Sequence, residues 1–86
     1  MPEISRFLGI IITMYYKDHS FPHFHVRYGE HRGVFSISEL KLIEGQLPRR
    51  ITSLVLEWAF EHREDLLEDW ELSKARKPLK DIEPLE

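Results

Sequence analysis

The sequence predicts an α+β domain in which a small three- to four-stranded, mainly antiparallel sheet packs against one or two C-terminal helices. Two patterns predict this fold. Short β-branched and aromatic stretches within residues 1–45 are typical of strands. Apolar side chains then recur at three- and four-residue steps through residues 46–77, as in helices with one buried face. The 86 residues suit a single domain, 1–86, that ends in an extended tail, 78–86.

The stretch RFLGIIITMYY, residues 6–16, predicts the first strand. Alternation would place two sets of side chains on opposite faces, namely Ile10, Ile12 and Met14 on one and Ile11, Thr13 and Tyr15 on the other. Both sets are largely apolar, so we expect a central strand that is covered on both sides. That expectation favours a homodimer or a hetero-complex across the face of the sheet that the helices leave open.

The following segments predict a loop, a hairpin and one more strand. Residues 17–22 form the loop, and HFHVRY, residues 23–28, alternates as a strand does. GEHRG, residues 29–33, has the length and the glycines of a hairpin connection, and VFSI, residues 34–37, returns beside it. ELKLIEG, residues 39–45, predicts a fourth strand, or a short turn followed by a strand.

Residues 46–77 predict either one long helix or two helices joined near residues 62–65. Pro48 fits a first-turn position, and Pro78 ends the pattern. One apolar stripe runs along the segment: Ile51, Leu54, Val55, Trp58, His62, Leu66 and Trp70. Acidic residues occupy much of the remaining surface, which we interpret as solvated.

Composition excludes some classes of function. The chain has no cysteine, so disulfides and thiolate metal sites are excluded. No apolar run approaches the roughly 20 residues that a membrane helix needs, and no convincing signal peptide is present, so we expect a cytoplasmic protein without membrane contact. The net charge is −3, yet residues 1–56 carry seven basic and five acidic side chains. An anion site is therefore expected in the first part of the chain, and broad nucleic-acid binding is not.

Three of the five histidines fall within residues 18–29, DHSFPHFHVRYG. His23 and His25 lie two apart on the predicted strand, so their side chains leave the same face about 7 Å apart. Such a pair begins a site for zinc or another divalent metal, with Asp18 or His19 from the preceding loop as further ligands. The same histidines, His19, His23 and His25, are also candidate proton-transfer groups. The plainest alternative is the solvated face of a half-buried strand.

Three arginines are candidate phosphate ligands. Arg27 shares the predicted face of His23 and His25, where it would suit metal-free phosphodiester cleavage. Arg49 and Arg50 begin the helical region, where the helix dipole disfavours cations but the backbone donors favour anions. A bound phosphate, a nucleic-acid backbone or an acidic partner surface would explain them. Alternatively, both point into solvent or pair with Glu44.

Two segments, DHSFPHFH and LPRR, together with the opening MPEISRF, resemble the bacterial domain-of-unknown-function family numbered 4160. The resemblance runs almost end to end, except that Phe21 stands where the family usually has proline. These positions match the signature: Asp18, His19, Pro22, His23, Phe24, His25, Gly29, Leu47, Pro48, Arg49, Arg50, Glu57 and Trp58. The resemblance implies a compact cytoplasmic α+β domain, often encoded beside another small domain in pairs that look like toxin–antitoxin modules. It implies no catalytic residues.

Two functional classes follow. In the first, the chain is a component of a toxin–antitoxin-like pair that acts on RNA through its histidines and arginines, with or without a metal. In the second, it is a noncatalytic protein-interaction module, such as the neutralising partner or a dimerisation partner. The acidic total charge favours the second class, because RNA-cleaving proteins usually present a broad positive surface.

Overall fold

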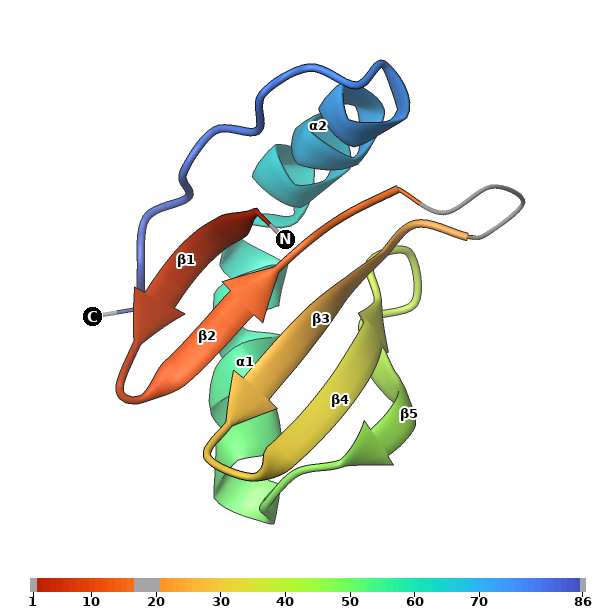
Figure 1. The fold of residues 1–86 in the computed structure, drawn as a ribbon. Helices are drawn as coiled ribbons and strands as arrows, with labels where there is room; N and C mark the ends of the chain where they lie inside the picture. Colours follow the sequence, from red (N-terminus) through yellow and green to blue (C-terminus); the bar gives the residue numbers. More distant parts are fainter. Residues whose placement is uncertain (1, 17–20, 86) are drawn as a thin grey trace.

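The computed structural model describes residues 2–16 and 21–85 and confirms the α+β class, with five strands instead of three or four (Figure 1). The strands and helices follow in this order: β1 (Glu3–Phe7), β2 (Ile10–Thr13), β3 (His23–Tyr28), β4 (His31–Ser36), β5 (Lys41–Gln46), α1 (Arg49–Glu61) and α2 (Arg63–Lys74). All neighbouring strands are antiparallel and lie in chain order. Helix α1 lies behind the sheet, and α2 lies beyond one end of it.

The prediction of one strand over residues 6–16 is wrong, because the chain turns within it. Leu8 and Gly9 have φ angles of 51° and 80° and form a tight turn between β1 and β2. Glycine adopts that geometry without steric cost, and a two-residue loop of this kind matches the twist of a hairpin. The two strands therefore pair with one another, and β1 is an edge strand.

The connection in the second hairpin is also shorter than the predicted residues 29–33. Only Gly29 and Glu30 lie between β3 and β4, so Arg32 belongs to a strand instead of a connection. Of the two alternatives for residues 39–45, the structure shows the short turn followed by a strand, because β5 begins only at Lys41. Its pairing with β4 contains a bulge, because Phe35 faces Leu42 whereas the adjacent Val34 faces Glu44. One extra residue, Ile43, is thereby inserted on the β5 side.

The helical region is two helices, which resolves the alternative left open by the sequence. Helix α1 ends at Glu61 and α2 begins at Arg63, with His62 between them at φ −116° and ψ 25°. The backbone N–H of His62 still donates to the Trp58 carbonyl, so the chain bends without leaving this N–H unpaired. Among the described residues, no helix is both long enough and apolar enough to span a bilayer.

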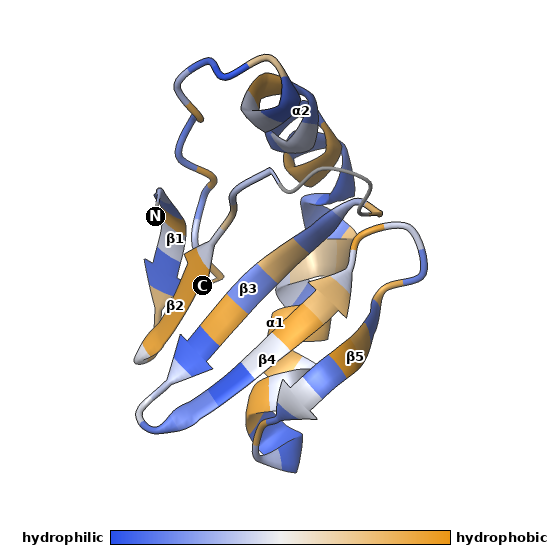
Figure 2. Cartoon of the chain, turned by 45° about the vertical axis from the view of Figure 1, so that its right-hand side comes forward, coloured by the Kyte–Doolittle hydropathy of each residue, from blue (hydrophilic) through white to orange (hydrophobic). Residues whose placement is uncertain are grey.

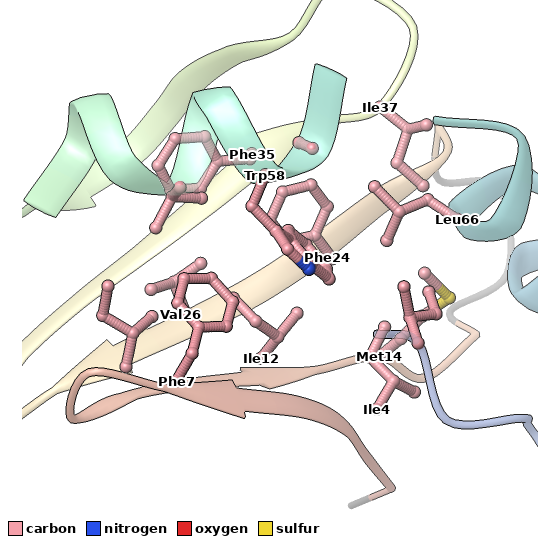
Figure 3. Packing of buried hydrophobic residues seen from close by; sticks show 14 of the residues in the cluster. Ile4, Phe7, Ile12, Met14, Phe24, Val26, Phe35, Ile37, Trp58 and Leu66 are labelled. Carbon is pink, nitrogen blue, oxygen red and sulfur yellow. The ribbon is translucent and has the colours of Figure 1, made fainter. Parts of the chain in front are cut away.

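The core lies between the sheet and the helices (Figure 3). Phe24 and Val26 of β3 point toward α1 and are buried, as alternation predicts. Trp58 of α1 is fully buried and contacts Phe7 and Phe24, with ring centroids 5.5 and 5.9 Å away. Because Trp58 contacts aromatic side chains of both β1 and β3, this residue ties α1 to the two hairpins.

The C-terminal tail closes the molecule by crossing α2 and returning to β1 (Figure 1). The Ile82 N–H donates to the Ile4 carbonyl at 2.8 Å, and Trp58 Nε1–H donates to the Glu83 carbonyl at 2.8 Å. Asp69 of α2 is fully buried and accepts the Lys80 N–H through Oδ1 at 3.0 Å. Its other oxygen, Oδ2, has no hydrogen-bond partner among the described residues. Burial raises the pKa of this carboxyl, with smaller contributions from Glu68 and Asp65.

We expect Asp69→Asn to stabilise the protein by about 1 kcal/mol at pH 7, because the amide oxygen still accepts the Lys80 N–H while a buried charge is lost. The raised pKa means that the folded state is protonated first, so the destabilisation caused by Asp69 itself is lost as the pH falls through the folded pKa of this carboxyl. The gap between variant and wild type should therefore narrow on acidification. Urea unfolding across a pH series measures this difference in the free energy of unfolding. Asp69→Ala loses the acceptor for the Lys80 N–H, so it should be less stable than Asp69→Asn at every pH. A gap that is independent of pH would contradict this account.

Candidate functional site

The face of the sheet opposite α1 is here called the open face, and in Figure 2 it lies in front of α1. This face carries a pocket of about 560 Å³. It is lined by Glu3, Ile11, Thr13, Tyr15, His25, Val26, Arg27, Arg32, Gly33, Val34, Glu44 and Gly45. Every strand contributes at least one of these residues, so the pocket exists only once the whole sheet has formed. Its lining combines guanidinium groups, carboxylates, an imidazole and aliphatic side chains.

Strand register arranges the open face in two rows. The first, which we call the histidine row, consists of directly paired residues on the five strands: Glu3, Thr13, His25, Val34 and Glu44. The second, the arginine row, is Arg6, Ile11, Arg27, Arg32 and Gln46. The rows are two residues apart along β3, which corresponds to about 7 Å. Cations and carboxylates thus occupy defined, separate positions.

Arg27 and Arg32 face one another directly across β3 and β4. Like charges in that arrangement destabilise a sheet. Both side chains are exposed, and neither forms an ion pair within 4 Å among the described residues. The third arginine of the row, Arg6, is occupied, because its Nη2 lies 2.7 Å from a Glu3 carboxylate oxygen. The central pair is therefore a cationic site that the described part of the chain does not neutralise by direct pairing.

Two carboxylates border the pocket at opposite edges. The hydrogen bonds from Arg6 hold the pKa of Glu3 below its ordinary value, and the charge of Arg27 acts in the same direction. Glu44 reaches the open face because of the β5 bulge, which places it opposite Val34. The bulge requires Gly45, whose φ is 82° and whose added Cβ would lie 2.2 Å from the Arg32 carbonyl oxygen. Among the described residues, Glu44 forms no ion pair.

The two histidines of β3 have different environments. His25 is half-buried, lines the pocket and stacks on Tyr15 with ring centroids 4.6 Å apart. His23 is only 6% exposed, because the Trp70 ring lies 5.1 Å from its own. Its Nδ1–H donates to the Phe21 carbonyl at 2.7 Å, which leaves Nε2 as the acceptor nitrogen of the neutral ring. The sequence pattern placed both histidines on an open face, but α2 closes off the position of His23.

The structure gathers some of the predicted site residues and separates others. His25 and Arg27 line the pocket, with His23 adjacent to His25 at a ring separation of 5.2 Å. Arg49 and Arg50 begin α1, which lies on the other side of the sheet, and they do not line the pocket. The predicted candidates Asp18 and His19 lie outside the described residues. Within residues 2–16 and 21–85, no three His, Asp or Glu side chains are placed to hold one metal ion.

Sequence reasoning missed three charged residues of the pocket, Glu3, Arg32 and Glu44. The glycines of residues 29–33 predict that Arg32 lies in a hairpin connection, although its position two residues after Gly29–Glu30 also fits a strand. Glu44 was considered only as a partner for Arg49 or Arg50. Strict alternation from Leu42 would point the Glu44 side chain toward the helices. The bulge turns this side chain to the open face instead. Gly45 was the one local indication of that bulge.

Comparison with known proteins gives one match. The model of a family described as a domain of unknown function, DUF4160, matches residues 9–71. That span begins at the β1–β2 turn and ends within α2, so it includes the pocket except for its contribution from β1. No curated protein and no solved structure matches the chain.

Proposed function

The chain belongs to the DUF4160 family, and we propose that it binds single-stranded RNA on the open face of its sheet. In this proposal it acts in the cytoplasm as one component of a toxin–antitoxin-like pair, in agreement with the resemblance drawn from its sequence. The observation that carries the RNA-binding proposal is the directly opposed Arg27–Arg32 pair, which has no carboxylate within ion-pair distance among the described residues.

A phosphate group would relieve the repulsion between these two guanidinium groups. Each can donate two parallel hydrogen bonds to phosphate oxygens, and hydrogen bonds of this charge-assisted kind are among the strongest that proteins form. Arg6 extends the row toward β1, and its Glu3 partner holds it near the pocket edge. The row crosses the strands, so successive phosphates of one strand would follow it across the sheet.

The aromatic pair beside the arginines favours single-stranded RNA over a duplex. Tyr15 and His25 stack on one another and both line the pocket, and His25 lies one row away from Arg27. Exposed sheet faces that combine aromatic side chains with cations bind unpaired bases by ring contacts, whereas duplex RNA hides its bases. The acidic residues concentrated in the second half of the chain would repel RNA and restrict it to this face.

The proposal is for binding, and it assigns no cleavage chemistry. Of the candidate proton-transfer residues, His25 lines the pocket and His23 is closed off by Trp70. A metal-dependent activity would need Asp18 or His19 to complete a ligand set with His23 and His25. Addition of zinc to the RNA-binding assay covers that possibility, since a zinc-dependent gain in affinity or RNA cleavage would replace the binding-only proposal.

A fluorescence anisotropy titration tests RNA binding directly. We expect a labelled single-stranded RNA of roughly 12 nucleotides to bind saturably, and the logarithm of affinity to fall linearly with the logarithm of salt concentration. Tyr15→Ala should weaken binding about tenfold, because one ring contact is lost. Equal affinity for a duplex of the same length, or no saturable binding at low salt, would refute the proposal. Growth with and without the neighbouring gene product tests the pair assignment.

A further inference from the structure

We propose that Glu44 makes this pocket select bases that carry an exocyclic amino group, with guanine preferred and uracil disfavoured. The inference rests on the proposed RNA binding and adds to it the chemical class of the preferred nucleotide. It concerns a residue that pairs directly with Val34 at the far end of the histidine row, on the β5 side of the pocket.

A carboxylate is out of place in a pocket that binds phosphate alone. Glu44 is exposed, lines the same pocket as Arg27 and Arg32, and takes part in no ion pair among the described residues. Unlike Glu3, whose charge is engaged by Arg6, Glu44 has no ion-pair partner among the described residues and would weaken the attraction of the arginines for a phosphate. A ligand that fits the whole pocket must therefore bring an anionic group for the arginines and hydrogen-bond donors for Glu44.

The two rows give the relative placement of those groups. Arg27 and Arg32 lie one row, or about 7 Å, from His25 and Val34 along the strands. Glu44 lies two strands from His25, or about 10 Å across the sheet. A nucleotide whose phosphate meets the arginine pair can lay its base along the histidine row. The outer edge of that base then points toward Glu44, over the small aliphatic surface of Val34.

The Watson–Crick edge of the base determines how well it satisfies a carboxylate. Guanine presents N1–H and an N2 amino group side by side, so it donates two parallel hydrogen bonds in the manner of a guanidinium group. Cytosine and adenine donate one hydrogen bond each from their amino groups. Uracil has a single N–H between two carbonyl oxygens, and both oxygens would face the Glu44 charge. The expected order of affinity is guanine, then cytosine and adenine, then uracil.

Binding of four oligouridine RNAs that differ only at one central position, G, C, A or U, tests this order. By anisotropy, we expect wild-type protein to bind the G-containing RNA about tenfold more tightly than the all-U RNA. Glu44→Gln should largely remove this ratio, because a neutral amide offers one acceptor oxygen in place of two. Glu39→Gln is the matched control, since it removes the same charge from an exposed residue outside the pocket and should preserve the preference.

The possible results separate this inference from the proposed function. Equal wild-type binding of all four RNAs would refute base selection and leave RNA binding intact. If Glu44→Gln raised affinity for all four RNAs equally, Glu44 would act only by repulsion, and the inference would again be wrong. Failure of the wild type to bind any of them would refute the proposed function itself.

Discussion

Replacing both Arg27 and Arg32 by alanine should lower the affinity for single-stranded RNA by at least about 100-fold at low salt. Each guanidinium group is expected to supply charge-assisted hydrogen bonds worth about 1.5–3 kcal/mol, and every tenfold change in affinity corresponds to about 1.4 kcal/mol. The loss should be nearly independent of RNA sequence, because phosphate contacts carry no base information. The slope of log affinity against log salt should also fall by about 2, one for each lost contact.

The same double substitution should not destabilise the fold. The two side chains are exposed and directly opposed, so their removal relieves repulsion between β3 and β4. The matched control is Arg49→Ala with Arg50→Ala, which changes the net charge equally at a place that does not line the pocket. If the control pair lost as much affinity as the Arg27–Arg32 pair, binding would depend on overall charge or on the start of α1. That result would contradict a site on the open face.

Trp58→Ala should lower the free energy of unfolding by about 3–5 kcal/mol. The indole is fully buried, contacts Phe7, Phe24 and His62, and donates its N–H to the Glu83 carbonyl. A domain of this size has a total stability of roughly 4–13 kcal/mol, so this single cavity removes a large fraction of it. Urea unfolding followed by circular dichroism measures the change.

Two other variants separate packing from hydrogen bonding at this position. Trp58→Phe keeps an aromatic ring but loses the donor to Glu83, so we expect an intermediate loss. Phe60→Ala lies two residues further along the same helix and removes a ring that is 73% exposed, so its effect should stay within about 0.5 kcal/mol. A Phe60 variant as unstable as the Trp58 variant would show that the outer surface of α1 is not solvated as the structure has it.

Local patterns were sufficient for the elements whose neighbours simply follow in the chain. The alternation in residues 23–28 predicted β3 and the inward direction of Phe24 and Val26, because a strand turns successive side chains to opposite faces. The three- and four-residue spacing predicted the helical region and the burial of Val55 and Trp58. The same patterns were ambiguous where a turn interrupted an apolar run, as at Leu8 and Gly9.

The histidine cluster illustrates a different limit. Alternation correctly put His23 and His25 two apart on one strand, with His25 in the pocket. It carried no information on Trp70, which comes from α2 and lies against His23 from more than forty residues away in the chain. Whether a polar side chain at a strand end is accessible depends on which distant element packs there, and a local pattern does not encode that contact.

Side-chain periodicity over a few residues was sufficient to predict the α+β class, the course of β3 and the face on which Arg27 lies. The tertiary structure alone decided that Arg27 opposes Arg32 and that Glu44 shares their pocket. Both facts depend on strand register. The two-residue turn between β3 and β4 sets the pairing of Arg27 with Arg32. One inserted residue in β5 sets the placement of Glu44, because a shift of one position moves a side chain to the opposite face of a sheet.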